Sequence, residues 1–209
     1  NNMFKLPGSA KPSSVWPSLL SVGCIVVVGL ILYSNTYQVP WYFDDVPAVV
    51  ENADIYNLQK ALQDTLSSGR GIATLTFALN YYYDGLDVWG YHLVNILVHL
   101  FSSCLVFFVL KRVFREAFAL PLFGALLFLA HPLQTQAVTY IVQRMASLAA
   151  LFFFLSIYLF IRAREGMSAA GTSRPMPWAI YFLSLVCGGM AVLTKQNTAV
   201  LPLVIFFFD

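Results

Sequence analysis

The chain has 209 residues and a net charge of +2, with 59% hydrophobic and only 11% charged residues. A soluble domain of this size carries roughly 25% charged residues, so the composition excludes an ordinary soluble domain and predicts an integral membrane protein in a lipid bilayer. The small charge and the absence of a basic run exclude nucleic acid as a partner. The three cysteines lie inside apolar runs and read as buried hydrophobic residues, not as a disulfide or metal site.

Six apolar segments follow one another along the chain. A membrane-spanning helix needs about 20 mostly apolar residues, and five segments meet or approach that length while the sixth is shorter. They cover about residues 15–33, 91–110, 117–130, 136–161, 177–193 and 198–209. The sequence therefore predicts an all-α, polytopic fold of about six transmembrane helices, with residues 1–209 as one membrane domain. Because the first residue is Asn and the sixth segment is short, we expect this stretch to belong to a longer product.

The Lys and Arg residues between these segments predict the orientation. If every segment spans, eight cations fall on one side and four on the other, and cytoplasmic loops carry the excess. The eight are Lys5, Lys11, Lys111, Arg112, Arg115, Arg162, Arg164 and Arg174; the four are Lys60, Arg70, Arg144 and Lys195. We therefore expect a cytoplasmic N-terminus and a localisation in a bacterial inner membrane, with the loop 34–90 in the periplasm.

The loop 34–90 holds seven of the ten acidic residues and is too long for a simple connector. The sequence predicts that it carries short interfacial helices. One would begin at Asp54 as its N-cap, because the apolar residues Ile55, Leu58, Leu62 and Leu66 recur at helical spacing after it. A second would run from about residue 72 to 83 and end at the turn signal Asp84-Gly85.

Asp44 and Asp45 stand directly after the first apolar segment, beside Trp41 and Tyr42. One interpretation is an acidic pair that caps a short helix near Pro47. The other is a reaction centre, because a carboxylate at the mouth of a membrane bundle is costly unless it is paired or functional. The residues alone leave both interpretations open.

A second polar group begins at His131-Pro132, where proline predicts a helix break. From there Gln136, Tyr140 and Arg144 recur every four residues, which predicts one polar stripe on a single helix. Arg144 would then form a salt bridge with Asp44 or Asp45, or bind a phosphate through its bidentate fork.

The remaining polar residues of the apolar segments give weaker signals. Lys195 and Gln196 form a turn on the same outer side, which is either a snorkelling turn or part of a site. His92 and His99 are interpreted as packing residues or as hydrogen-bonding residues of the bundle, and Asn80 and Asn95 carry no signal of their own. The sequence has no Gly-rich phosphate loop, zinc spacing or Ser/His/Asp arrangement. Any catalysis would use carboxylates as general bases and fixed cations that neutralise a leaving phosphate.

Five motifs in joint order resemble one family: FDDVPAVVENAD at 43–54, LTFALN at 75–80, GLDVWGYHLVN at 85–95, HPLQTQAV at 131–138 and TKQNTAVLP at 194–202. They are similar to the N-terminal membrane portion of the transmembrane and tetratricopeptide-repeat (TPR), O-mannosyltransferase-like proteins, especially bacterial relatives. These are GT-C glycosyltransferases that use polyprenyl-phosphate sugars. The resemblance implies that this stretch is the N-terminal half of such a fold and is incomplete as an enzyme by itself.

The resemblance implies a transferase that moves a sugar from a polyprenyl-phosphate donor to a hydroxyl on an exported protein or glycan. Asp44 and Asp45 would be catalytic and would hold any divalent metal. Arg144 and Lys195 would bind the donor phosphate, with His131, Gln136, Tyr140 and Gln196 in support. Many members carry Glu at the positions of Gln136 and Gln196, so no acid role is expected there. The alternative function is a non-catalytic scaffold or accessory subunit of a larger membrane complex.

Overall fold

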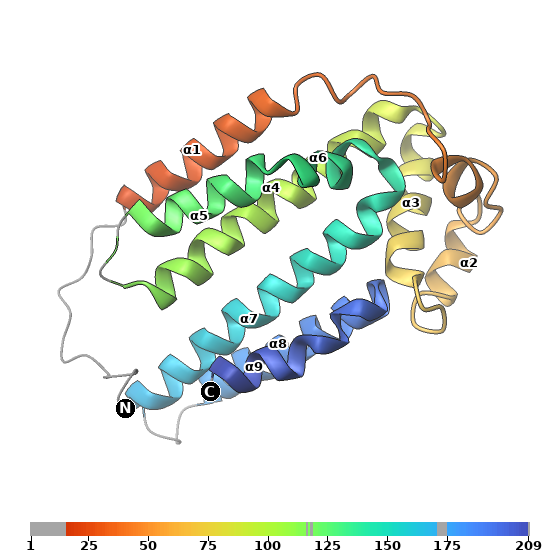
Figure 1. Cartoon of the computed structure of the whole chain (residues 1–209). Helices are drawn as coiled ribbons and strands as arrows, with labels where there is room; N and C mark the ends of the chain where they lie inside the picture. Colours follow the sequence, from red (N-terminus) through yellow and green to blue (C-terminus); the bar gives the residue numbers. More distant parts are fainter. Residues whose placement is uncertain (1–15, 116, 118, 171–174, 209) are drawn as a thin grey trace.

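The computed structural model describes residues 16–115, 117, 119–170 and 175–208, and all regular secondary structure in these ranges is helical (Figure 1). Val15, Lys5, Lys11, Arg174 and Asp209, which entered the predictions above, lie outside the described residues. The α-helices are α1 (Trp16–Leu32), α2 (Leu58–Gln63), α3 (Gly71–Asp84), α4 (Val88–Val113), α5 (Ala119–Ala130), α6 (Pro132–Thr139), α7 (Arg144–Ala170), α8 (Pro175–Thr194) and α9 (Leu201–Phe208).

Three helical stretches are long and apolar enough to cross a bilayer, namely Val88–Val113, Ile141–Ser168 and Pro175–Thr194. Three further apolar stretches are shorter: Trp16–Leu32, Ala119–Ala130 and Gln196–Phe207. The 12 residues of α5 rise only about 18 Å, which is less than a hydrocarbon core of ~30 Å. The chain is therefore an all-α integral membrane protein, and the crossing of the three shorter helices stays a prediction.

The long helix α4 lies at the centre of the bundle. It packs against α1 and α5 on one side and against α7 on the other, and α7 packs along α8 (Figure 1). Ile25 of α1, Leu129 of α5 and Ile96 of α4 share one buried cluster. Val98 of α4 and Leu148 of α7 belong to another. Burial of these apolar side chains on both faces of α4 fixes its position between the two layers.

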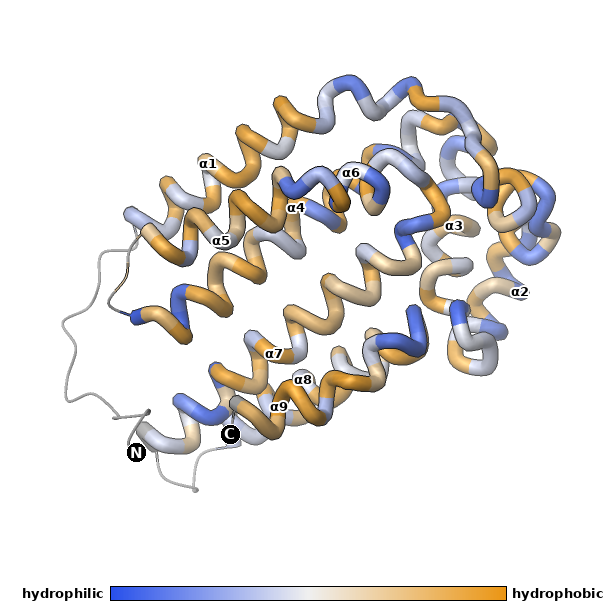
Figure 2. Tube along the Cα trace, viewed as in Figure 1, coloured by the Kyte–Doolittle hydropathy of each residue, from blue (hydrophilic) through white to orange (hydrophobic). Residues whose placement is uncertain are grey.

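Hydrophobic residues predominate along the helices of the bundle (Figure 2). Many large hydrophobic side chains are exposed; they include Leu20 of α1, Phe123 of α5, Phe182 of α8, and Phe206 and Phe207 of α9. A soluble protein rarely exposes apolar surface on this scale, and such surface marks contact with lipid or protein. This agrees with the membrane assignment made from composition.

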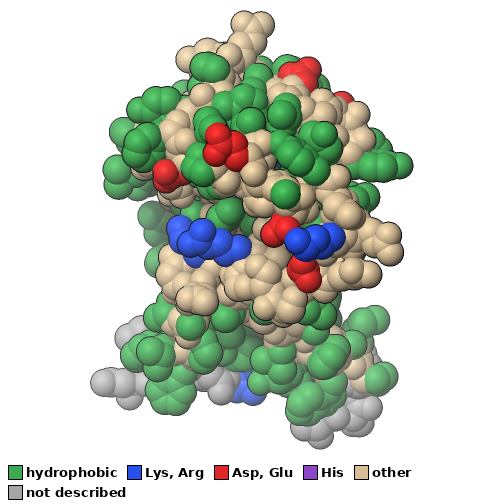
Figure 3. Space-filling model, turned by 90° about the vertical axis from the view of Figure 1, so that its right-hand side faces the viewer, with side chains coloured by type: hydrophobic (Ala, Val, Ile, Leu, Met, Phe, Trp, Pro, Cys, Tyr) green, Lys and Arg blue, Asp and Glu red, His purple; other side chains and the backbone are tan. Residues whose placement is uncertain are grey.

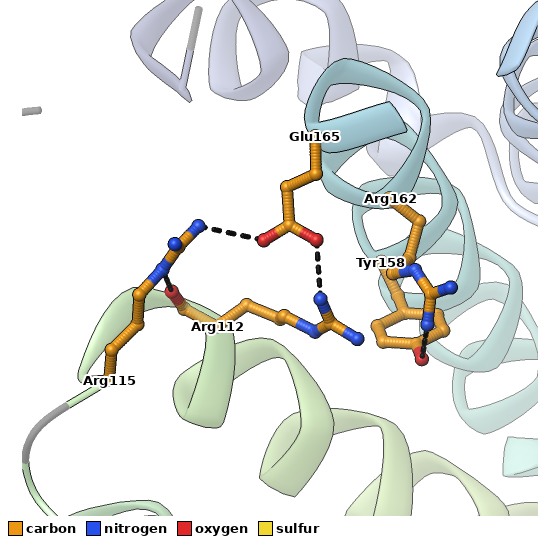
Figure 4. A network of polar contacts seen from close by, with 5 residues as sticks. All are labelled: Arg112, Arg115, Tyr158, Arg162 and Glu165. Carbon is orange, nitrogen blue, oxygen red and sulfur yellow. Dashed lines mark hydrogen bonds and ion pairs between the residues drawn. The ribbon is translucent and has the colours of Figure 1, made fainter. Parts of the chain in front are cut away.

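One end of the bundle carries a small ionic cluster that joins α4 to α7 (Figure 4). Glu165 of α7 accepts from Arg115 at 2.8 Å and also pairs with Arg112 of α4. Half-exposed pairs of this kind contribute only about 0–1 kcal/mol each, so the cluster orients the helix ends more than it stabilises them. The positive-inside rule predicts a cytoplasmic location for this end, and the orientation stays a prediction.

The loop 34–90 forms a helical cap at the other end of the bundle (Figures 1 and 3). It consists of a π-helical turn at Val46–Val50, then α2 and α3. Val49, Ile55, Ala61 and Phe77 are buried together in it, against Tyr91 of α4. In the space-filling view, acidic and basic side chains of this end are interspersed among hydrophobic ones.

The predicted N-cap of the first loop helix is wrong. α2 begins at Leu58, and the side chain of Asn57 caps it by accepting the Lys60 N–H at 3.0 Å. Asp54 lies one turn too early and instead pairs with the Lys60 ammonium at 2.5 Å. The second helix is confirmed, because α3 ends at Asp84 and Gly85 adopts φ +61°, a conformation that glycine tolerates without steric cost.

Candidate functional site

A break in the chain between α6 and α7 forms the centre of the candidate site. The break predicted at His131 is confirmed, because α5 ends at Ala130 and α6 begins at Pro132. The single helix predicted to follow is wrong. α6 ends at Thr139, Tyr140 is extended at φ −92° and ψ 111°, and the 3₁₀ turn Ile141–Gln143 leads into α7. Gln136, Tyr140 and Arg144 therefore do not form one helical stripe.

The Asp45 side chain forms a hydrogen bond with the backbone at the break between α6 and α7. Its carboxylate accepts the Val142 N–H at 2.7 Å and the Tyr42 N–H at 3.3 Å, and the residue is 1% exposed. Burial raises the pKa of the Asp45 carboxyl, while these N–H bonds act in the opposite direction. Val142 lies in the first turn before α7, where a helix leaves N–H groups without an internal partner. A carboxylate is the favoured partner at that end of a helix.

The side-chain amide of Asn95 on α4 donates hydrogen bonds to the backbone carbonyl groups that flank Tyr140 at the break. Its amide nitrogen lies 3.3 Å from the Val138 oxygen and 3.3 Å from the Ile141 oxygen, and Asn95 is fully buried. An unpaired carbonyl in a membrane interior costs several kcal/mol. The donor and acceptor groups freed by the break are thus satisfied from two distant segments, which explains why the helix can interrupt here.

Arg144 joins three helices through its guanidinium group and is 0% exposed. Nε donates to Asn95 Oδ1 at 2.7 Å, Nη1 donates to Asn80 Oδ1 at 2.6 Å, and Nη2 donates to the Tyr91 carbonyl at 2.8 Å. The ring of Phe77 lies 4.5 Å from its central carbon. Arg144 therefore contacts protein and not lipid. Among the described residues, its partners are neutral oxygens and aromatic rings, and the salt bridge to Asp44 or Asp45 is not formed.

Asp44 differs from its neighbour because it is exposed. Its N–H donates to the Tyr140 hydroxyl at 2.8 Å. Burial raises the pKa of Tyr140, and the Asp44 and Asp45 carboxylates add to the increase while the Asp44 N–H opposes it. Tyr140 therefore remains a neutral hydroxyl at physiological pH. An open carboxylate beside a phenol is an arrangement that can accept a proton from a bound hydroxyl.

The turn that carries Asp44 is strained at Phe43. Phe43 adopts φ +48°, a region that bulky residues rarely occupy and that costs of order 1–3 kcal/mol. The turn is closed by the Asp45 N–H, which donates to the Tyr42 carbonyl at 2.9 Å. The Asp45 carboxylate in turn accepts a hydrogen bond from the Tyr42 N–H. Strain of this kind clusters at functional sites, and here it lies one residue before the exposed carboxylate.

The other predicted site residues do not join this group. The ring of exposed His131 accepts the Leu133 N–H at 3.3 Å and caps α6, and Gln136 is exposed on that helix. Lys195 precedes the 3₁₀ turn Gln196–Val200, and the Gln196 amide lies beside Gly69 of the loop. Within the described ranges, no hydrogen bond or ion pair connects these residues to Asp44.

The described residues contain no group of three or more His, Cys, Asp or Glu side chains that could hold a metal ion. Asp45 has both carboxylate oxygens bonded to backbone N–H groups. Asp44 is therefore the member of the pair whose oxygens are open to a ligand.

Three residues of the network were missed from the sequence alone, namely Asn80, Asn95 and Thr76. Thr76 contributes its carbonyl to Arg144 at 3.2 Å. The available signal was that an amide on an apolar helix requires a partner, and that Arg144 on its own requires acceptors. Asn80 and Asn95 are those acceptors. The two histidines are confirmed as bundle hydrogen-bonders, because His92 lies 2.8 Å from the Val39 oxygen and His99 lies 3.1 Å from the Leu129 oxygen.

Helices, composition and the polar break together define an integral membrane protein with a buried polar centre near one end of the helical bundle. The chain is a distant homologue of the TMTC protein O-mannosyl-transferases over most of its length. It is 30% identical over 213 residues to protein O-mannosyl-transferase TMTC4 of Homo sapiens, covering 89% of this chain. It is 33% identical over 186 residues to TMTC2 of Homo sapiens, and 32% identical over 197 residues to Tmtc2 of Drosophila melanogaster, covering 81% and 87% of this chain.

The chain spans 28%, 21% and 21% of the lengths of these three relatives. No family model matches it, and no solved structure matches it. The homology confirms the resemblance inferred from the five motifs. The bacterial type and the N-terminal placement within a longer fold stay predictions.

Proposed function

We propose that this chain is the catalytic membrane portion of a glycosyltransferase that acts at the outer membrane face. The relatives are named protein O-mannosyl-transferases, so mannose is the sugar we propose, and a protein hydroxyl is the acceptor. The donor is a polyprenyl-phosphate-linked sugar in the bilayer. The observation that carries the proposal is the division of the acidic pair, in which Asp45 is buried and bonded while Asp44 is exposed beside Tyr140.

The proposed reaction forms one bond and breaks another. The acceptor hydroxyl oxygen attacks the anomeric carbon of the sugar, and the bond from that carbon to the phosphate oxygen breaks. The electron pair of that bond leaves with the polyprenyl phosphate, and the hydroxyl proton passes to the Asp44 carboxylate. A general base must lie within about 3 Å of the proton that it removes, and the exposed position of Asp44 permits such an approach.

In this proposal Asp45 and Arg144 hold other residues in position and do not contact the substrate. Asp45 holds the start of α7 and the turn at Tyr42, so it places Asp44 and Tyr140 next to each other. The prediction that Arg144 binds the donor phosphate would require its guanidinium to leave Asn80, Asn95 and Tyr91. Lys195, which is partly exposed, is the cation that we propose for that phosphate. A divalent metal at Asp44 also stays a prediction.

The second candidate function is a non-catalytic scaffold or accessory subunit. The observation in its favour is that the described residues bring no cation to Asp44, since neither Lys195 nor Arg144 forms an ion pair with it. In a transferase, this cation would come from a conformational change or from chain outside these 209 residues. Transfer activity of the full-length protein separates the two functions.

The test measures sugar transfer in membranes that contain the full-length protein, a polyprenyl-phosphate mannose donor and an acceptor peptide. Asp44→Asn keeps the shape of the side chain and removes the base, so we expect a loss of about 10²–10⁴-fold. Glu51→Gln is the matched control, because Glu51 is an exposed acid of the same loop whose side chain forms no hydrogen bond or ion pair with a described residue. Near-wild-type transfer by Asp44→Asn would exclude Asp44 as the base, and no transfer by any form of the protein would favour the scaffold.

A further inference from the structure

A cavity of about 250 Å³ lies between the chain that follows α1 and the junction of α5 with α6. One wall runs from Leu32 to Val39, and the other contains Ala130, Thr135 and Thr139. It does not include Asp44, Arg144 or Lys195. Asn35 and Thr135 are exposed, so the cavity opens to the surface beside them.

The polar side chains in this cavity have no partner in the described part of the protein. Asn35, Thr36, Thr135 and Thr139 line it, and no side-chain hydrogen bond from any of them to a described residue is found. By contrast, some threonine hydroxyls in other parts of the structure have a hydrogen-bond partner. Thr65, for example, donates to the Ala61 carbonyl at 2.7 Å. Four unpaired polar groups that share one cavity can offer their hydrogen bonds to a ligand.

Thr36 is the most informative of the four because it is only 2% exposed. Among the described residues, the His92 Nδ1 atom is the sole fully occluded side-chain nitrogen or oxygen without a partner. The unpaired Thr36 hydroxyl is therefore not fully occluded, and Thr36 is one of the residues that line the cavity. Because this hydroxyl has no protein partner, it can donate to or accept from a ligand that enters the cavity.

The chemistry of the lining selects a neutral polar ligand. None of the lining residues is charged, whereas phosphate sites use Arg, Lys or helix N-termini. Three hydroxyls and an amide can both donate and accept, and Leu32 and Ala130 add apolar surface. A pyranose ring combines hydroxyls at its edge with apolar C–H faces. Pockets for drug-sized ligands measure about 300–1,000 Å³, so the cavity suits a single sugar unit.

We propose that this cavity is the subsite for the transferred sugar, an inference that rests on the function proposed above. Thr139 lines the cavity, and the next residue, Tyr140, bears the hydroxyl that contacts the Asp44 backbone. Thr139 and Tyr140 are consecutive residues at the end of α6, so the proposed subsite and the turn that carries the proposed base both contact this segment. The hydroxyls of Thr36 and Thr139 hold the sugar, and Asp44 acts on the acceptor.

The first experiment measures binding without transfer. Full-length protein in nanodiscs is mixed with methyl α-mannopyranoside, and ligand resonances are followed by saturation-transfer NMR. We expect a signal that disappears in Thr36→Val and Thr139→Val and persists in Thr65→Val and Asp44→Asn. Inorganic phosphate at the same concentration should not compete. Thr36→Val should melt no lower than wild type, because the lost hydroxyl has no protein partner.

The second experiment measures transfer with the same variants. Loss of one hydrogen bond worth about 0.5–1.5 kcal/mol should raise the donor KM of Thr36→Val by about 2–10-fold while Thr65→Val stays at the wild-type value. An unchanged KM together with unchanged mannoside binding in Thr36→Val and Thr139→Val would overturn the subsite, even if transfer is active. Binding that depends on Thr36 without any transfer would uphold the subsite and overturn the proposed function instead.

Discussion

The Asp45 carboxylate lies 2.7 Å from the backbone nitrogen of Val142, although the two residues are 97 positions apart in the chain. This bond connects the first loop to the start of α7. Each segment supplies what the other lacks, because a buried carboxylate needs donors and a helix start has free N–H groups. The strained turn at Phe43 and the break at Tyr140 are both held by this one side chain.

Asp45→Asn should destabilise the fold, whereas Asp44→Asn should not. Asparagine keeps only one of the two acceptor oxygens, and its NH₂ group would face the N–H of Tyr42 or Val142. A buried donor left without a partner costs about 1–3 kcal/mol. Thermal unfolding in nanodiscs measures the difference. Equal melting temperatures for the two variants would mean that Asp45 does not hold the break.

The stabilisation by Asp45 should also depend on pH. Burial raises the pKa of this carboxyl, so the folded chain binds its proton more tightly than the unfolded chain does. The contribution of this pKa difference to the free energy of unfolding is then complete below the ordinary Asp pKa of about 3.9. It is lost as pH rises through the higher pKa of the folded state. The melting-temperature gap between wild type and Asp45→Asn should therefore narrow as pH rises from about 3.5. A gap that widens over this range would contradict the raised pKa.

The sequence located most of the helices because apolar composition and proline act locally. His131-Pro132 ended α5 as expected, and Asp84-Gly85 ended α3. Both signals depend on neighbouring residues, since proline restricts the residue before it and glycine tolerates positive φ. Asp44 and Asp45 stood out for a similar reason, because two adjacent acids directly after an apolar segment are rare.

The break at Tyr140 could not be predicted from local sequence. Residues 136–144 contain neither proline nor glycine, and their polar spacing fits a helix. What ends α6 is the set of distant partners, Asp45 for the Val142 N–H and Asn95 for the carbonyls. The sequence likewise could not distinguish Asp44 from Asp45, because their difference in burial arises only when the loop packs against the break.

Arg144→Lys should lower stability sharply even though it keeps the charge. A single ammonium cannot reach Asn80, Asn95 and the Tyr91 carbonyl together, as the planar guanidinium does. Each lost bond to a charged group costs about 1.5–3 kcal/mol. The matched control is Arg162→Lys, because Arg162 is exposed and, among the described residues, its side chain bonds Tyr158 alone, at 3.4 Å. If Arg144 binds donor phosphate instead, Arg144→Lys should melt normally and raise only the donor KM.

The loop 34–90 and the far end of α7 should lie on opposite sides of the membrane. Ser68 is exposed in the loop and Ser168 is exposed near the other end of the bundle. In a variant with Cys24, Cys104 and Cys187 replaced, a membrane-impermeant thiol reagent added outside should label Ser68→Cys and spare Ser168→Cys. The reverse pattern would invert the predicted orientation, and labelling of both from outside would show that α7 does not cross.

The last prediction concerns the Tyr140 hydroxyl, which accepts the Asp44 N–H at 2.8 Å. Tyr140→Phe removes this oxygen but keeps the ring, which packs edge-on against Tyr42 with centroids 6.0 Å apart. The exposed Asp44 backbone can exchange the lost bond for water, so the melting temperature should hardly change. If the hydroxyl positions the base, the lost bond of about 0.5–1.5 kcal/mol should lower kcat by about 2–10-fold and leave the donor KM unchanged.

The double variant Asp44→Asn/Tyr140→Phe provides the control for this effect. If Tyr140 acts through Asp44, its removal should cost nothing further once the base is absent, and the two effects should not add. Single-turnover transfer with excess full-length protein measures the chemical step free of donor binding. Additive losses would mean that Tyr140 contacts the substrate by itself, and a fall in Tyr140→Phe beyond about 10²-fold would exceed the effect of one lost hydrogen bond and exclude a purely positioning role.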